Sequence, residues 1–217
     1  MRTIRVTGKG QMMVHPDTTR ITIDLRRICS EYGDAVEASA KDTEALKEEM
    51  APFGFDRKDL KTLHFDVSPE YERYKVKDEY KSRLIGYRYD HTLKVEFASD
   101  NKLLGRILFA LGMCRLKPEF RISYTVKNPE AVKNELLGKA VKEAVEKAGV
   151  LSSAAGLHLG EIQSMDYSWG RTEYEVRFME KMLDCEAMPV GSNSYDLDME
   201  PDDINAEDTV TVVWEIR

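Results

Sequence analysis

The stretch that decides the fold is residues 85–97, which read IGYRYDHTLKVEF. Apart from His91, its odd-numbered positions are apolar or aromatic, and from Arg88 to Glu96 the residues between them are polar or charged. Alternation of this length is typical of a β-strand with one buried face and one solvated face. We therefore predict a long strand here, with His91 on its apolar side as a core histidine.

Shorter alternating stretches occur before and after this strand. They predict further strands at residues 21–25, 63–67, 120–126, 162–169 and 210–216, with one slip in the alternation of the fourth. Their polar outer faces favour antiparallel sheets that are covered on one side.

Three segments have helical spacing between the predicted strands. The first begins with a capping-box-like pair, Asp34 and Glu37, and is followed by an apolar face. That face consists of Val36, Ala40, Thr43, Leu46 and Met50. A short helix is predicted over 101–112, and a longer one begins at Asn128 with Pro129 in its first position.

The order of these elements predicts an α+β fold made of two strand-helix-strand-strand lobes, with mainly antiparallel sheets and helices on one face. The first lobe covers about residues 1–98, the helix at 101–112 connects the lobes, and the second lobe covers about 119–217. Residues 72–83 are charged and aromatic and are expected to form a hairpin tip. Residues 184–208 are rich in acidic and turn-forming residues and predict an acidic loop.

Composition narrows the function classes. The chain has 217 residues, a formal net charge of −7 and a pI near 5.3, which argues against nucleic-acid binding. Three widely spaced cysteines, Cys29, Cys114 and Cys185, suggest free thiols in a reducing compartment. No signal peptide and no membrane span is recognisable, so the sequence predicts a cytoplasmic protein.

The histidines are the first candidates for chemistry. His15-Pro16-Asp17 places an imidazole near a carboxylate, which suits a metal site or an acid–base pair, but the same residues suit a rigid turn between strands. His64 and Asp66 lie side by side on the polar face of a predicted strand, and two ligands do not complete a zinc site. His158 fits the turn between a helix and a strand.

Other motifs have equally plain interpretations. Gly8-Lys9-Gly10 resembles part of a phosphate cradle, but it also suits a strand end or bulge that needs glycine. Cys114 is expected to be a small core residue, and Trp169 to belong to an aromatic strand face. The acidic residues from Asp196 to Asp203 suit a solvated loop better than a calcium site. We therefore predict no catalytic, cofactor or metal site.

Several motifs together resemble SIMPL-domain proteins. They are IRVTGKG at 4–10, VHPD at 14–17, LIGY at 84–87, LHLGEI at 157–162 and VTVVW at 210–214. The resemblance covers essentially the whole chain as a single domain. It implies an α+β fold, a large homo-oligomer in at least one member, a link to oxidative stress and no catalytic residues. The chain departs from the family pattern in two ways. It starts directly at its first strand, whereas most bacterial members are exported. It has Pro201-Asp202 where the family usually has Pro-Gly.

Three functions follow as hypotheses. The first is a non-enzymatic structural or interaction protein that assembles with itself through strand edges. The alternative is a small-molecule- or metal-binding enzyme that uses His15, Asp17 or His64. The third is an adaptor that presents residues 184–208 to a basic protein partner.

Overall fold

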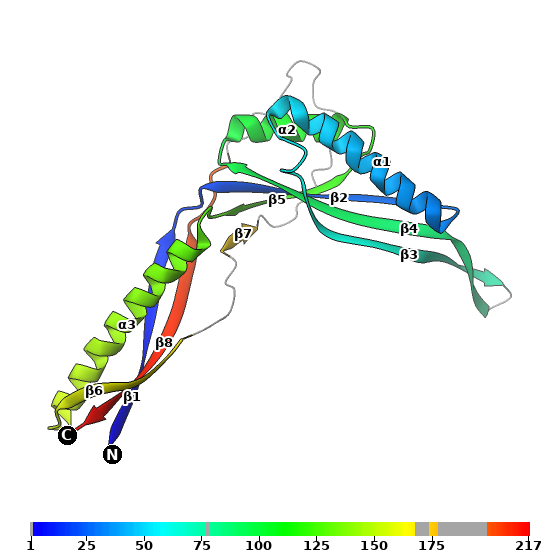
Figure 1. The fold of residues 1–217 in the computed structure, drawn as a ribbon. Coiled ribbons are helices and arrows are strands. Elements are labelled where there is room, and N and C mark those ends of the chain that lie inside the picture. Colours follow the sequence, from blue (N-terminus) through cyan, green and yellow to red (C-terminus); the bar gives the residue numbers. More distant parts are fainter. Residues whose placement is uncertain (1, 77–78, 168–173, 178–198) are drawn as a thin grey trace. The chain divides into compact units, whose positions relative to one another are not determined.

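The computed structural model describes residues 2–76, 79–167, 174–177 and 199–217 (Figure 1). The elements in chain order are β1 (Thr3–Val14), β2 (Thr18–Cys29), α1 (Tyr32–Met50), a short 3-10 turn (Ala51–Phe53), β3 (Lys61–Val76), β4 (Glu79–Ala98), α2 (Asn101–Met113), β5 (Glu119–Thr125), α3 (Pro129–Ala154), β6 (Leu159–Tyr167), β7 (Glu175–Arg177) and β8 (Ile204–Ile216). The predicted α+β class is confirmed.

The strands form two sheets. One has the order β1-β8-β6 and the other the order β3-β4-β2-β5-β7. The pairings β1–β8, β6–β8, β2–β4 and β3–β4 are antiparallel. This agrees with the predicted sheet type.

The chain divides into two compact units. The central unit consists of Thr18–Ser123 and Arg177–Glu200, and the terminal unit of Met1–Asp17, Tyr124–Val176 and Pro201–Arg217. Residues 1–17 were expected in the first lobe, whereas β1 pairs along its whole length with β8, which was expected in the second. Alternation identifies a strand but not its partner, so this pairing between β1 and β8 could not be predicted from the sequence pattern.

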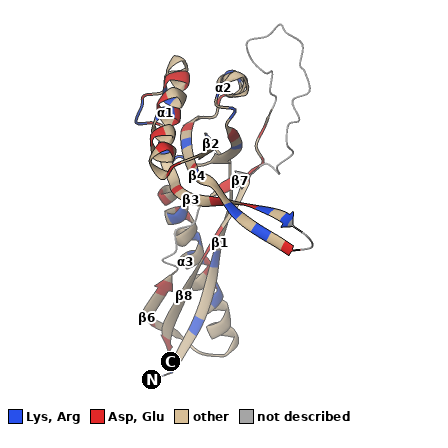
Figure 2. Cartoon of the chain, turned by 90° about the vertical axis from the view of Figure 1, so that its right-hand side faces the viewer, with Lys and Arg blue, Asp and Glu red and all other residues tan. Residues whose placement is uncertain are grey.

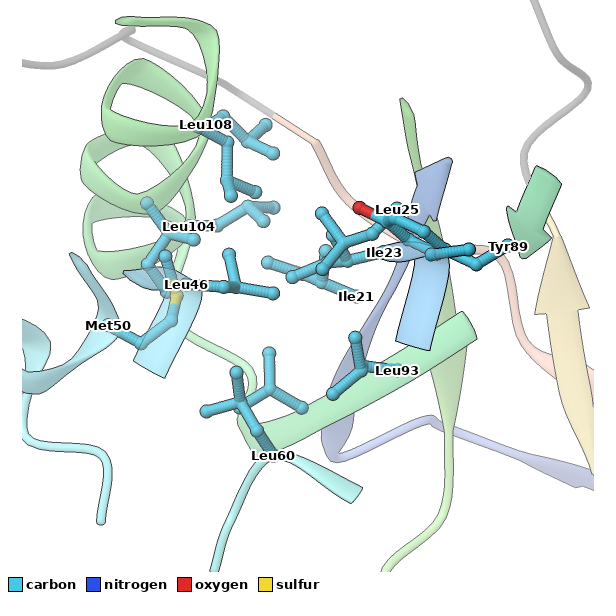
Figure 3. Close-up of a cluster of buried hydrophobic side chains, with 14 residues drawn as sticks. Ile21, Ile23, Leu25, Leu46, Met50, Leu60, Tyr89, Leu93, Leu104 and Leu108 are labelled. Carbon is cyan, nitrogen blue, oxygen red and sulfur yellow. The ribbon is translucent and has the colours of Figure 1, made fainter. Parts of the chain in front are cut away.

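The core of the central unit lies between the sheet and the helices α1 and α2 (Figure 3). The strand predicted at 85–97 is confirmed as the C-terminal part of β4, and Tyr89, Leu93 and Val95 point into this core. Ile85 does not follow the pattern, because a bulge shifts the β3–β4 register between Glu70 and Tyr71 and leaves Ile85 exposed. Each fully buried aliphatic side chain contributes about 1.5–3 kcal/mol by leaving water.

Helix α1 begins earlier and faces another way than predicted. Its N-cap is Glu31, which makes no side-chain capping bond, and Asp34 lies in the first turn. Its buried residues are Ala35, Ser39, Asp42, Leu46 and Met50. The predicted face fails at its N-terminal end because hydrophobicity alone does not reveal that Ser39 and Asp42 have hydrogen-bond partners in the sheet.

The starts of α2 and α3 depend on side-chain caps. Asp100 accepts hydrogen bonds from the backbone N–H groups of Lys102 and Leu103, at 2.9 and 3.1 Å. Asn128 accepts one from Ala131 at 3.1 Å, with Pro129 in the first turn, as the sequence predicted. These caps satisfy donors that have no partner within the helix.

In the terminal unit, α3 lies along β1 and β8 (Figure 1). The alanines Ala140, Ala144 and Ala148 are fully buried against Val6, Val212 and Trp214. Two glycines of β1 allow this close packing. A Cβ atom on Gly8 would lie 2.0 Å from the carbonyl oxygen of Ala140, and one on Gly10 would lie 2.0 Å from that of Leu136.

The interpretation of Gly8 and Gly10 as a strand end or bulge was therefore wrong. Both lie in the middle of β1, and neither is among the glycines with positive φ, which are Gly54, Gly86 and Gly156. They are needed for the close approach of a helix and not for backbone freedom.

Two segments predicted as loops are partly strand. Residues 72–83 form the outer end of a hairpin, as expected, but β3 continues through them to Val76 and β4 begins at Glu79. Of the predicted acidic loop 184–208, residues 204–208 form the start of β8, and residues 184–198 lie outside the described residues. Within the part of the chain that the structure describes, no helix is long and apolar enough to cross a membrane.

Candidate functional site

His15 and Asp17 lie in the connection between β1 and β2, and they have different partners. His15 Nδ1 lies 3.0 Å from Asp203 Oδ1. The carboxylate of Asp17 accepts a hydrogen bond from the backbone N–H of Lys127 at 2.8 Å, and its own N–H donates to the carbonyl of Thr125 at 3.2 Å. The connection is thus a tethered turn, and the two side chains do not form a pair.

His64 and Asp66 are exposed on β3, as expected for a solvated strand face. His64 follows a bulge between Thr62 and His64 and belongs to the central unit, whereas His15 belongs to the terminal unit. No group of three or more potential metal ligands occurs within residues 2–76, 79–167, 174–177 and 199–217. No observation in these residues favours the enzyme that would use His15, Asp17 or His64.

His91 is the centre of a hydroxyl network on the helix-covered side of β4. Its Nε2 lies 2.9 Å from Thr62 Oγ1, and its Nδ1 lies 3.0 Å from Thr43 Oγ1 and 3.2 Å from Ser39 Oγ. Burial lowers the pKa of His91, and the positive charge of Lys47 lowers it further. The ring is therefore held neutral, as a histidine with satisfied hydrogen bonds.

A partly buried cluster of Tyr89, Asp42 and Arg27 joins α1 to the sheet, and it was not predicted from the sequence. The hydroxyl of Tyr89 donates to the carboxylate of Asp42, and Arg27 Nη2 lies 2.7 Å from Asp42 Oδ2. Tyr89 is 1% exposed and Asp42 is 7% exposed. Burial raises the pKa of Tyr89, as does its hydrogen bond to Asp42. The sequence feature that could have indicated this cluster is Asp42, an aspartate four residues before Leu46 on the same side of α1.

The sheet face opposite the helices carries a network of ion pairs. Arg20 Nε and Lys94 Nζ both donate to Glu96 Oε1, at 2.7 and 2.9 Å, and Arg121 lies 3.1 Å from Asp24. Burial opposes ionisation of Glu96, but the hydrogen bonds from Lys94 and Arg20 lower its pKa overall. Because these charges neutralise one another, the face does not present a field of one sign to a partner.

Exposed large apolar side chains gather on two strand regions. In the hairpin, Tyr80 is 76% and Tyr71 is 56% exposed. On β6, Ile162 is 51% and Met165 is 43% exposed. Contiguous exposed apolar surface is characteristic of interaction sites. These two regions are the candidate site of the protein.

The hairpin continues β3 and β4 beyond the part of the sheet that α1 covers, and it carries both basic and acidic residues (Figures 1 and 2). Three of its cross-strand pairs, which alternate with the others, are Tyr71–Leu84, Arg73–Ser82 and Lys75–Tyr80. Since paired residues of antiparallel strands project to the same side, these six side chains form one surface, which we call the hairpin face.

The other candidate residues from the sequence have structural positions or lie outside the described residues. Cys114 is a buried free thiol, as predicted, and Cys29 is a half-buried one. His158 lies between α3 and β6, where its backbone exchanges hydrogen bonds with Arg217. The slip predicted in the alternation of β6 corresponds to register shifts in its pairing with β8. Trp169 and Cys185 lie outside the described residues.

Comparison with known proteins gives a family match over nearly the whole chain. The model described as "SIMPL: Protein of unknown function (DUF541)" matches residues 4–214. The 26 kDa periplasmic immunogenic protein of Brucella abortus (strain S19) is 26% identical over 226 residues, which cover 99% of this chain and 84% of that protein.

Two further relatives carry the name "Uncharacterized protein YggE". The one from Edwardsiella ictaluri is 27% identical over 192 residues, covering 83% of this chain and 77% of the relative. The one from Escherichia coli (strain K12) is 23% identical over 219 residues, covering 99% and 83%.

The Brucella proteins contradict one prediction. They are named as periplasmic, so the prediction of a cytoplasmic protein was wrong. Its physical basis was weak, because sparse free cysteines suit any protein that folds without disulfides, in either compartment.

Proposed function

Because this chain belongs to the SIMPL family of proteins of unknown function, we propose that it is a non-enzymatic interaction protein that assembles with itself. The family resemblance seen in its sequence motifs is thereby confirmed, and the proposal concerns what the family description leaves open.

The observation that supports self-assembly is the exposed apolar surface on strands without a helical cover. Helix α3 packs mainly on β1 and β8, and residues 161–167 of β6 are all exposed. The hairpin likewise exposes Tyr71, Tyr80 and Leu84. Strands with open edges and apolar side chains are the usual templates for pairing with another chain.

The two end strands of the three-stranded sheet, β1 and β6, differ in how open their edges are to a new strand. On β1, the backbone N–H of Lys9 donates to Glu143 Oε2 of α3 at 2.5 Å, which partly blocks this strand as a template. The same hydrogen bond is the main reason why the pKa of Glu143 is lowered. This contrast favours β6 over β1 as the interaction strand.

We place this activity in the periplasm, on the strength of the Brucella relatives. Fractionation of the native host, with detection by a specific antibody, tests this assignment. The protein is expected in the periplasmic fraction together with a periplasmic marker enzyme. Recovery with a cytoplasmic marker would contradict it.

Multi-angle light scattering after size exclusion tests self-assembly. At tens of micromolar the protein is expected to elute with a mass several times that of one 24.9 kDa chain. A clean monomer at this concentration would remove the proposal.

A further inference from the structure

We infer that β6 of one copy pairs antiparallel with β6 of a second copy, about a two-fold axis perpendicular to the sheet. This inference rests on the proposed self-assembly and names the surface that makes the contact. It depends on which side of β6 carries the apolar side chains, on the open edge of this strand and on the fit of β6 to its own copy.

The apolar side chains of β6 project to the side of the sheet that α3 covers. Ile162 pairs with Trp214 of β8. Met165 pairs with Val212, and paired residues of antiparallel strands project to the same side. Trp214 and Val212 are buried against the alanines of α3. This helix packs mainly on β1 and β8, so Ile162 remains 51% and Met165 43% exposed on the core side of the sheet.

This side of β6 carries no charge from Ile162 to Tyr167. The charged residue of that stretch, Asp166, pairs with Thr211 and projects to the opposite side of the sheet. Among the described residues, β6 also ends its sheet, so its outer backbone groups are open to a further strand. The strand that fits here supplies backbone hydrogen bonds along the edge and apolar side chains on the α3 side.

A second copy of β6 meets both requirements. A two-fold axis perpendicular to the sheet reverses the direction of the strand and keeps its α3 side on the same side of the sheet. The two three-stranded sheets then continue as one sheet. Ile162 and Met165 of both copies lie together on it, in the space that neither α3 helix covers.

The charges of β6 are compatible with this pairing. We place the axis within the exposed apolar stretch, at Ile162 or at Met165. At each of these centres, an uncharged residue of one copy lies opposite an acidic residue of the other, so no like charges are paired. The pairs are Gln163 with Glu161 for the first centre and Ser164 with Asp166 for the second.

The other long end strands of the described residues, β1 and β3, fit β6 less well. The apolar side of β1 is already covered by α3, and Glu143 accepts a hydrogen bond from the backbone of Lys9 at its edge. On the outer part of β3, Glu72 projects to one side and Arg73 to the other. Either side of β3 would therefore set a charged residue beside the uncharged side of β6.

Variants of opposite charge at the same position test the inference in the full chain. Ile162→Lys, Ile162→Glu, Met165→Lys and Met165→Glu are each expected to weaken self-association about tenfold, because each puts like charges on the uncharged side of the pair. The dissociation constants are measured by sedimentation velocity over a concentration series. The wild-type assembly is expected to contain an even number of chains, because a two-fold contact joins them in pairs.

Mixing the variants distinguishes contact between two β6 strands from contact with any other surface. The Lys and Glu variants of one position are combined as dilute monomers and then concentrated together. At the position where the axis lies, a lysine of one copy then meets a glutamate of the other. This mixture is expected to assemble within about threefold of the wild type.

Met113→Lys is the matched control. Met113 is 73% exposed at the end of α2, in the central unit. The same change of side chain is expected to leave association unchanged there. Circular dichroism and the melting temperature of every variant should match the wild type, since all these sites are exposed.

The outcomes separate this inference from the proposed function. A monomeric wild type would remove both. A wild type that assembles, with the Ile162 and Met165 variants associating as tightly as Met113→Lys, would overturn the inference alone. Recovery in neither mixture, or an odd number of chains, would also overturn it, because β6 then does not meet its own copy about a two-fold axis.

Discussion

Gly8 and Gly10 determine how closely α3 lies on β1. A side chain on either would meet the helix backbone, which cannot rotate away as a side chain can. The sequence showed the two glycines and the buried alanines of α3, but it did not show that they meet, because β1 and α3 are far apart in the chain.

Gly8→Ala is therefore expected to destabilise the protein by about 1–3 kcal/mol or more, through overpacking. The measurement is the urea midpoint of unfolding at constant m-value. Gly138→Ala in α3 is the control, because a Cβ there would have no neighbour within 4 Å. Alanine favours a helix over glycine by about 1 kcal/mol, so the control is expected to gain stability. Equal midpoints for the two variants would contradict the packing argument.

The cluster of Tyr89, Asp42 and Arg27 is held by one hydrogen bond and one ion pair to the same carboxylate. Tyr89→Phe removes the donor to a buried carboxylate and is expected to destabilise the protein by about 1–3 kcal/mol. Tyr80→Phe, at an exposed tyrosine, is expected to change stability by less than about 0.5 kcal/mol. The free energies of unfolding of the two variants are measured with urea at neutral pH. If Tyr89→Phe is as stable as the wild type, the hydroxyl does not stabilise α1 on the sheet.

His91 makes stability depend on pH. Its pKa in the folded protein is lowered from the usual histidine value of 6.5 by burial and by the charge of Lys47. Between that lowered value and 6.5 the unfolded chain binds more protons than the folded one, so stability rises with pH and is lost as pH falls below 6.5.

Substitution of His91 tests this dependence. His91→Gln is expected to flatten the stability profile between neutral pH and about pH 5, relative to the wild type. His64→Gln, at an exposed histidine, should retain the wild-type slope. An unchanged slope in His91→Gln would assign the dependence to other groups.

Among the elements, helices with side-chain caps were predicted best. Asn128, Pro129 and the alanine spacing located α3, and local residues determine each of these signals. The buried face of α1 differs from the prediction at its N-terminal end, because Ser39 and Asp42 turn toward the sheet. There they form hydrogen bonds with His91 of β4 and Arg27 of β2. The outer hairpin was expected to be a tip because both its sides are solvated, which leaves no apolar alternation to detect.

The cap of α3 provides a prediction at this scale. Asn128→Ala removes the hydrogen bond to the Ala131 N–H and is expected to lower stability by about 1 kcal/mol. Asn134→Ala, at an exposed position of the same helix, is the control and should be neutral or slightly stabilising. Thermal or urea unfolding distinguishes them, and equal stabilities of the two variants would show that the Asn128 cap does not stabilise the helix.

For the whole molecule, the sequence predicted the fold class and the family but not the pairing of the units' strands or the location of the candidate site. The hairpin face exists because residues from two strands pair in one continuous register, which begins directly after the bulge between Glu70 and Tyr71. The exposure of β6 follows from where α3 ends its contact with the sheet. Both are tertiary properties, and no motif in the chain encodes them locally.

The pairing of β1 with β8 joins Thr3 to Glu215 and Val14 to Ile204. A ribosome produces the chain from its N-terminal side, so β1 is made long before its partner strand β8. Most core residues of the central unit lie in the uninterrupted stretch Thr18–Ser123, so this unit can form much of its core before β8 is made. Until β8 is made, β1 lacks this partner strand, and protecting it is a task for the chaperones that hold nascent chains.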